Sequence, residues 1–174
     1  MSIEKLKSSL RTVPDFPVKG ILFWDVTTLF KDPDCLRELV DILYDLYKDK
    51  GITKVVGLES RGFVVGPALA LRLGAGFVMA RKPGKLPAET LSESYMKEYG
   101  PDTIEIHTDA ITPDDVVLIH DDLLATGGTV AAAARLVAQF RPRRTLANYI
   151  IEIGELNGRA ALPEGIETSS VIRV

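Results

Sequence analysis

The sequence has little of what disulfide-bonded, zinc-binding and membrane proteins need. Its 174 residues include one cysteine, Cys35, which excludes an intramolecular disulfide and a Cys-x-x-Cys zinc site. Residues 1–10 place charges among their apolar side chains and do not form a signal peptide. The longest weakly charged stretch, residues 62–80, contains Arg72 and is broken by glycine and proline, so it is not a membrane span. We therefore expect a cytoplasmic protein without a membrane partner.

An excess of charge of one sign is lacking too. The formal net charge is -3 and 26% of the residues are charged, so no broad basic surface exists and nucleic acid is not an expected partner. The hydrophobic fraction of 46% in a chain of this length is enough for one sizeable core. We predict a single domain over residues 1–174.

Short apolar runs alternate with helical segments along most of the chain. Strands are expected at residues 55–58, 77–80, 116–119 and 147–153, and helices between Asp32 and Gly51, at 63–73 and at 129–140. Because the strands are continuous apolar runs, helices should cover both faces of a mostly parallel sheet. The predicted fold class is α/β, doubly wound.

Residues 81–113 depart from this alternation. Prolines, glycine and frequent charges interrupt the segment, and only residues 103–107 alternate like a half-exposed strand. A long irregular segment inside a compact domain is usually functional, so we expect a flap at about residues 82–107.

An acidic and glycine-rich loop is expected after the strand at 116–119. Thr126-Gly127-Gly128-Thr129 opens the next helix, where glycines, backbone amides and the helix dipole favour a phosphate. Asp121 and Asp122 stand just before it and suit vicinal hydroxyls or a shared metal ion. Ligands bind beyond the carboxyl ends of parallel strands, so this pattern predicts a site for a phosphorylated ribose. The less favoured alternative is a pair of solvated acids beside a plain turn.

Other phosphate and metal motifs are missing from the sequence. It contains no G-x-x-x-x-G-K-[ST] and no G-x-G-x-x-G after a strand. Its two histidines, His107 and His120, do not form an H-E-x-x-H pair, and His120 is interpreted as a strand-end residue rather than a catalyst.

The run from Val116 to Thr129 resembles the phosphoribosyl-pyrophosphate signature of the type I phosphoribosyltransferases. Four apolar residues, two acids and a loop ending in Thr-Gly-Gly-Thr match that signature, while His120 departs from it at a position that is commonly apolar. Further blocks resemble the adenine phosphoribosyltransferases in order and spacing. They are residues 15–23, 57–63, 81–87, 94–100 and 155–159.

This resemblance implies transfer of a phosphoribosyl group from 5-phosphoribosyl 1-pyrophosphate to adenine, giving AMP and pyrophosphate. It implies Mg²⁺ as cofactor, held mainly through substrate oxygens, with Asp121 or Asp122 as the protein's own candidate ligand. It also implies a homodimer in which Arg81 reaches toward the neighbouring pyrophosphate site.

The resemblance assigns roles that the residues alone do not settle. It implies that the ribose 5-phosphate is bound by Asp121, Asp122, Ala125, Thr126, Gly127, Gly128 and Thr129. It implies that the pyrophosphate is bound by Glu59, Ser60, Arg61, Arg81, Lys82 and Lys85, with a cis peptide between Glu59 and Ser60. It implies that adenine is bound by Leu22, Phe23, Trp24, Arg61 and Leu123, within an N-terminal base-binding hood at about residues 1–30.

Glu98 matches the acid/base of the family and would manage the imidazole proton of adenine under the closed flap. Trp24 departs from the family at a position that is often basic, so it cannot act on the base or the flap by charge. Without the resemblance, Glu59 and Arg61 would be interpreted as an exposed ion pair and Glu98 as an ordinary surface glutamate.

Three alternatives remain beside this hypothesis. The first is a phosphoribosyltransferase for another base, such as hypoxanthine, guanine, xanthine or orotate. The second is a non-catalytic regulator that senses phosphoribosyl pyrophosphate and binds DNA, for which the sequence shows no basic or helix-turn-helix segment. The third is a receiver-like domain, which would leave the Thr-Gly-Gly-Thr loop unexplained.

Overall fold

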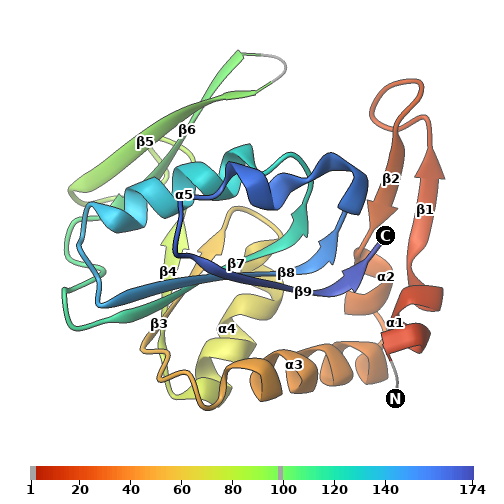
Figure 1. Cartoon of the computed structure of the whole chain (residues 1–174), viewed down its shortest axis with the longest axis horizontal. Coiled ribbons are helices and arrows are strands. Elements are labelled where there is room, and N and C mark those ends of the chain that lie inside the picture. The colour runs from red at the N-terminus through yellow and green to blue at the C-terminus, as the bar shows by residue number, and fades with distance from the viewer. Residues whose placement is uncertain (1–2, 98–99) are drawn as a thin grey trace.

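A five-stranded parallel sheet forms the centre of the computed structural model, which describes residues 3–97 and 100–174 (Figure 1). Its strands are β3 (Lys54–Leu58), β4 (Gly76–Ala80), β7 (Val116–Leu124), β8 (Arg144–Glu152) and β9 (Glu167–Arg173), in the order β4-β3-β7-β8-β9. All four neighbouring pairs are parallel. The predicted doubly wound α/β class is therefore confirmed.

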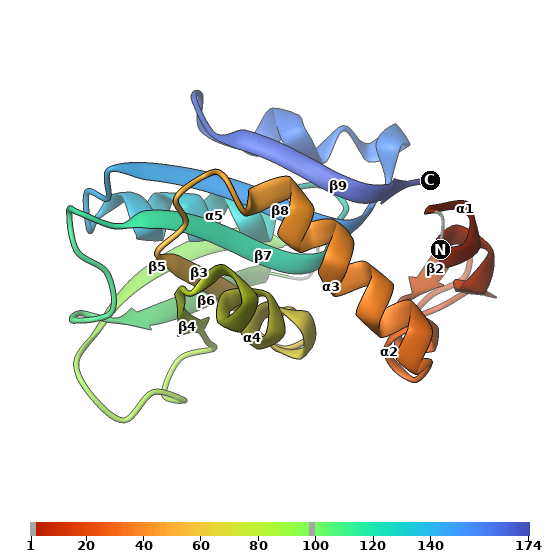
Figure 2. The ribbon, with the colours of Figure 1, turned by 90° about the horizontal axis from the view of Figure 1, so that it is seen from below.

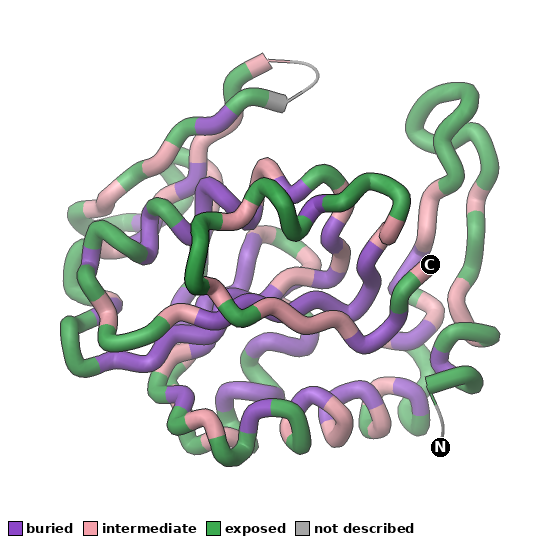
Figure 3. The backbone as a smooth tube through the Cα atoms, in the orientation of Figure 1, coloured by how far each residue is buried: buried purple, intermediate pink, exposed green. Residues whose placement is uncertain are grey.

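Helices cover both faces of this sheet. The helices α3 (Pro33–Tyr47) and α4 (Gly62–Leu73) lie against one face, and α5 (Gly128–Ala138) lies against the other (Figures 1 and 2). The alternation of side chains along β7 divides the core, because Leu118 packs with α3 and α4 while Val117 and Ile119 pack with α5. The central strands are buried along most of their length (Figure 3).

The start of α3 follows the prediction from Asp32 and Pro33. The side chain of Asp32 accepts hydrogen bonds from the backbone amides of Asp34 and Cys35, each at 2.9 Å, and Pro33 occupies the first turn. This N-cap satisfies two amides that have no partner within the helix. Gly51, with φ of +68°, follows the end of the helix.

The N-terminal hood stands beyond the carboxyl ends of β7 and β8 (Figure 1). It consists of α1 (Ile3–Ser9), the antiparallel strands β1 (Arg11–Pro14) and β2 (Leu22–Asp25), and α2 (Thr27–Phe30). Asp25 fastens the hairpin, since its carboxylate pairs with Arg11 and accepts a hydrogen bond from the Thr27 hydroxyl at 2.6 Å.

The flap is an antiparallel hairpin of β5 (Thr90–Lys97) and β6 (Gly100–His107). The half-exposed strand expected at residues 103–107 is confirmed as part of β6, but its partner at residues 90–97, which pairs with β6 along its whole length, was not expected. Arg81, just after β4, bridges to Glu105 and so connects the hairpin to the central sheet.

Two further expectations about the strands are corrected. The strand expected at 116–119 continues to Leu124, which places Asp121 and Asp122 in β7 instead of in a loop. The strand expected to be the last, β8, is followed by the 3-10 turns η1 (Gly154–Leu156) and η2 (Gly158–Ala161) and then by β9. The extension of β7 and the strand β9 are both paired in the sheet, and neither is an uninterrupted apolar run.

Candidate active site

The loop between β7 and α5 encloses a cavity of about 200 Å³. Arg61 and residues 121–130 line this cavity, so the predicted phosphate residues Ala125, Thr126, Gly127, Gly128 and Thr129 lie together. The N-terminus of α5 begins at Gly128, and its first amides have no helical partner. This arrangement suits an anion.

Gly127 is required by the packing behind this loop. Its φ is +85°, and an added Cβ would lie 2.1 Å from the carbonyl oxygen of Gly158. Both the backbone conformation and the space therefore exclude a side chain at position 127.

The two acids lie at the floor of this cavity. The backbone amide of Asp122 donates to Asp121 Oδ1 at 2.9 Å, and Arg61 Nε lies 2.7 Å from Asp122 Oδ2. Asp122 is only 4% exposed, which rules out the alternative of two solvated acids. Burial, followed by the charge of Asp122, raises the pKa of Asp121 well above its usual range, and burial raises the pKa of Asp122 against the opposing effect of Arg61.

A second cavity of about 300 Å³ adjoins the first at the turn after β3. Its lining includes Glu59, Ser60, Arg61, Lys82 and both acids, and the Glu59–Ser60 peptide is cis, as the resemblance implied. The alternative interpretation, in which Glu59 and Arg61 form an exposed ion pair, was wrong. Glu59 instead pairs with Arg81 Nε at 3.1 Å and accepts from the Lys82 amide at 2.9 Å, and this amide, followed by Arg81, lowers the pKa of Glu59.

The three predicted cations differ in their positions. Lys82 lines the second cavity, and its ammonium group pairs with Asp102. Arg81 is engaged by Glu59 and by the carbonyl oxygen of Lys85, which accepts from Nη1 at 3.3 Å. Neither Arg81 nor Lys85 lines one of the cavities described here.

A third, largely apolar cavity of about 480 Å³ lies between the hood, the flap and β7. The predicted base residues Leu22, Phe23, Trp24 and Leu123 line it, together with Tyr95 and Leu156. Arg61 lies outside this lining, but its guanidinium carbon is 5.5 Å from the centre of the Phe23 ring. Aliphatic and aromatic lining of this kind favours a flat heterocycle.

Tyr95 and Asp102 form a connection that the sequence did not reveal. The Tyr95 hydroxyl donates to Asp102 Oδ2 at 3.1 Å and accepts from the Thr129 hydroxyl at 3.2 Å. Tyr95 lines both the second and the third cavity. No motif marks Asp102, whereas the block at 94–100 pointed to Tyr95. Glu98 lies outside the described residues.

His120 lies in the core, as a residue inside β7. It is fully buried and its Nδ1 lies 2.8 Å from Asn148 Oδ1 on β8. Burial lowers its pKa to about 4, and it lines none of the three cavities. The prediction that His120 ends its strand is corrected, because β7 continues to Leu124, whereas the prediction that it is no catalyst stays a prediction.

The described residues contain no cluster of three His, Cys, Asp or Glu side chains that could hold a metal ion. Mg²⁺, however, commonly uses one or two carboxylates together with substrate phosphates and water. Asp121 and Asp122 provide such carboxylates beside an anion cavity, so the donor set fits Mg²⁺ bound mainly by substrate.

Comparison with known proteins points to one family. The model of the phosphoribosyl transferase domain matches residues 25–154. Adenine phosphoribosyltransferase of Phocaeicola vulgatus is 66% identical over 172 residues, which are 99% of each chain. The corresponding protein of Bacteroides thetaiotaomicron is 60% identical over 172 residues, covering 99% of this chain and 98% of the relative.

Solved structures agree with these relatives. Adenine phosphoribosyltransferase from Rhodothermus marinus has a TM-score of 0.93 at 49% identity, covering 99% of this chain and 98% of the other. The enzyme from Giardia lamblia, solved with 9-deazaadenine, has a TM-score of 0.95 at 40% identity, covering 100% and 98%. The part of the chain that the structure describes has no helix of the length and apolarity needed to span a bilayer.

The fold, the phosphate loop and the matching domain model define a type I phosphoribosyltransferase, a pentosyltransferase. Within that class, the chain belongs to the adenine phosphoribosyltransferase family.

Proposed function

We propose that the chain transfers the 5-phosphoribosyl group from 5-phosphoribosyl 1-pyrophosphate to adenine, giving AMP and pyrophosphate. The observation that carries this proposal is the junction of three cavities at one edge of the sheet. An anion loop, a cavity of mixed charge and an apolar pocket adjoin there, and Arg61 and Tyr95 each border the second cavity and one of the other two.

The ribose 5-phosphate occupies the first cavity in this proposal. Its phosphate accepts hydrogen bonds from the amides and hydroxyls of residues 125–129, and its vicinal hydroxyls donate to Asp121 and Asp122. When the bond from C1 of ribose to pyrophosphate breaks, positive charge develops on the sugar ring. The two carboxylates stabilise that charge.

The pyrophosphate occupies the second cavity, against the turn Glu59–Arg61 and the ammonium group of Lys82. Arg81 and Lys85 complete its binding, although Arg81 must then exchange its contact with Glu59 for the leaving group. Cations at this position neutralise the departing charge.

Adenine occupies the third cavity between Phe23 and Leu123, and Leu22 and Trp24 also line this cavity. Arg61 lies between this cavity and the acids and offers the base a polar contact. The ring nitrogen N9 then forms the new bond to C1 of ribose.

Glu98 takes up the imidazole proton in this proposal. We therefore expect Glu98→Gln to lower kcat more than it weakens phosphoribosyl-pyrophosphate binding. An unchanged kcat in this variant would show that Glu98 does not have this role.

Mg²⁺ is the proposed cofactor, held by substrate oxygens with Asp121 or Asp122 as the protein ligand. When bound, it would neutralise the charge of the pyrophosphate. Removing it with a chelator should abolish turnover, and restoring it should recover turnover. Activity that persists in excess chelator would contradict the proposal.

We further propose a cytoplasmic homodimer in which residues 1–174 act as one domain. The single cysteine, Cys35, is buried and has no second cysteine with which to form an intramolecular disulfide, which suits a reducing compartment. The α4 face formed by Val64, Pro67, Ala68 and Leu71 is apolar and exposed, which supports a second copy as its partner.

The decisive experiment measures pyrophosphate release with phosphoribosyl pyrophosphate, Mg²⁺ and a panel of bases. We expect adenine to give the highest kcat/KM among adenine, hypoxanthine, guanine, xanthine and orotate. A preference for a 6-oxopurine or for orotate would replace adenine as the substrate. Binding of phosphoribosyl pyrophosphate without release with any base would instead indicate a non-catalytic sensor.

A further inference from the structure

The 3-10 turn η2 packs against the loop at residues 125–128. An added Cβ at Gly158, the first residue of η2, would lie 2.2 Å from the carbonyl oxygen of Ala125. From the loop side, an added Cβ at Gly127 would lie 2.1 Å from the carbonyl oxygen of Gly158. The two backbones therefore touch directly, and the position of η2 sets the position of the loop.

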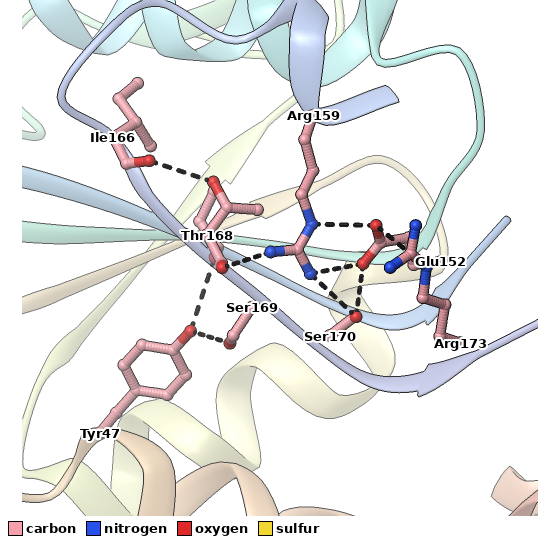
Figure 4. A network of polar contacts seen from close by, with 9 residues as sticks. Tyr47, Glu152, Arg159, Ile166, Thr168, Ser169, Ser170 and Arg173 are labelled. Atoms are coloured by element: carbon pink, nitrogen blue, oxygen red, sulfur yellow. Dashed lines mark hydrogen bonds and ion pairs between the residues drawn. The ribbon is translucent and has the colours of Figure 1, made fainter. Parts of the chain in front are cut away.

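The side chain of the next residue, Arg159, fixes η2 to the sheet (Figure 4). Its Nε donates to Glu152 Oε1 at 2.9 Å and its Nη2 to Glu152 Oε2 at 2.5 Å. Nη1 donates to the carbonyl oxygen of Thr168 at 3.0 Å, and Nη2 also contacts the Ser170 hydroxyl at 3.2 Å. All three nitrogens of the guanidinium group are thus engaged within the protein.

The partner of Arg159 is itself held rigidly. Glu152 is the last residue of β8, lies in register with Leu124 of β7 and is only 3% exposed. The Ser170 hydroxyl on β9 donates to Glu152 Oε2 at 2.6 Å. A bidentate arginine–carboxylate pair fixes orientation as well as distance, so the turn is tied to two neighbouring strands, β8 and β9.

We propose that Arg159, through Glu152 and Ser170, is a positioning residue for ribose 5-phosphate binding. Arg159 lines none of the three cavities, so it acts on the substrate through Gly158 and the loop at residues 125–128. This inference rests on the proposed function for the identity of the phosphate ligand. A displacement of about 1 Å in such a loop can cost on the order of 100-fold in activity.

Arg159→Gln removes the charge and the bidentate contact and is the principal test. We expect the Kd for ribose 5-phosphate, measured by calorimetry, and the KM for phosphoribosyl pyrophosphate to rise about tenfold or more. The KM for adenine should rise less, because residues of the hood and the flap also line its pocket, whereas residues 121–130 supply all of the first cavity's lining except Arg61. Arg159→Lys keeps the charge but not the planar fork, so it should give an intermediate effect.

Arg144→Gln is the matched control. Arg144 Nη2 pairs with Glu167 Oε2 at 2.5 Å, an arginine–glutamate contact between the same two strands, at their opposite end. We expect its loss to leave the Kd for ribose 5-phosphate unchanged. If Arg159→Gln does not fold, Arg159→Lys and Ser170→Ala carry the test with the same readouts.

Three results would overturn the inference. They are an unchanged Kd for ribose 5-phosphate in the folded variants, an equal rise in the KM of both substrates, and an equal effect of Arg144→Gln. Binding of ribose 5-phosphate does not require transfer to a base. A failure of the proposed function with adenine is therefore separable from a failure of the positioning role.

Discussion

Aspartate residues in this molecule behave in opposite ways according to their surroundings. Asp121 and Asp122 line the same cavity, and burial raises both pKa values. Asp25 instead has its pKa lowered to about 2, first by the Thr27 hydroxyl and then by Arg11. The carboxylate charge is therefore costly at the substrate site and stabilising in the hood.

Asp122→Asn should separate activity from stability. Burial raises the pKa of Asp122 even though Arg61 opposes the shift, so its charged form costs stability in the folded protein and we expect the melting temperature to stay the same or to rise. Turnover should fall about 100-fold, because the acid that faces the ribose is lost. Thermal unfolding and steady-state kinetics test this together, with the exposed Asp114→Asn as control. A melting temperature that falls along with activity would show that Asp122 is structural.

Asp25→Asn should destabilise the hood in a pH-dependent manner. The folded pKa of about 2 lies below the ordinary aspartate value of 3.8, so the stabilisation is present above pH 4 and disappears as the pH falls toward 2. We expect a loss of about 1–2 kcal/mol at neutral pH, reduced by screening because the Arg11 side chain is half exposed.

Urea unfolding of wild type and Asp25→Asn between pH 5 and pH 2.5 measures this difference. The gap between the two proteins should close toward the acid end. A gap that stays constant over the range would show that the charge of Asp25 contributes nothing.

At the scale of elements, the side chain of Tyr95 joins the flap hairpin to the start of α5. Tyr95 on β5 contacts Asp102 on β6 and Thr129 at the start of α5 through its hydroxyl. The position of the hairpin and the position of the phosphate loop therefore depend on each other.

Tyr95→Phe should keep the hairpin packed and remove this connection. Each hydrogen bond contributes about 1 kcal/mol, so we expect turnover to fall about three- to tenfold with little change in the melting temperature. Tyr44→Phe on α3, far from the cavities, is the matched control. Equal turnover in the two variants would show that the connection has no role.

The elements differ in how far the sequence reveals them. The runs that form β3 and β4 are short and apolar, and Asp32-Pro33 is a strong helix start, so these were predictable. The last strand, β9, was missed because Glu167–Arg173 is mostly polar at the edge of the sheet. The acids were placed in a loop because nothing in a sequence shows that a strand continues through charged residues.

The site was predictable where residues stand close in the chain and unpredictable where they do not. Thr126 to Thr129 form one loop and carry a local signal. The contact of Arg61 with Asp122, and the close approach of Gly127 to the carbonyl oxygen of Gly158, join separate segments. Such pairings follow from the order of strands in the sheet, which a pattern of residue types does not specify.

At the scale of the whole molecule, one apolar helix face remains uncovered. Leu71 is 82% exposed and Val64 is 46% exposed, and both lie on the same face of α4. An exposed apolar face of this kind supports the homodimer proposed above, with a second copy of the chain covering it.

Leu71→Glu should therefore shift the molecule from dimer to monomer. A charge in the centre of an apolar interface is costly to bury, so we expect light scattering to give the monomer mass for this variant and the dimer mass for wild type. Leu46→Glu, on the exposed side of α3, should leave the mass unchanged. An active wild-type monomer would contradict the proposed assembly.

The contact between Gly127 and Gly158 also has a consequence for biosynthesis. The ribosome makes the phosphate loop before it makes η2 and the β9 residues Thr168 and Ser170 that hold Arg159. A nascent chain that has just completed its loop still lacks the support behind it. Cellular phosphoribosyl pyrophosphate should therefore stabilise finished molecules but not growing ones, and folding up to that point must proceed without help from the ligand.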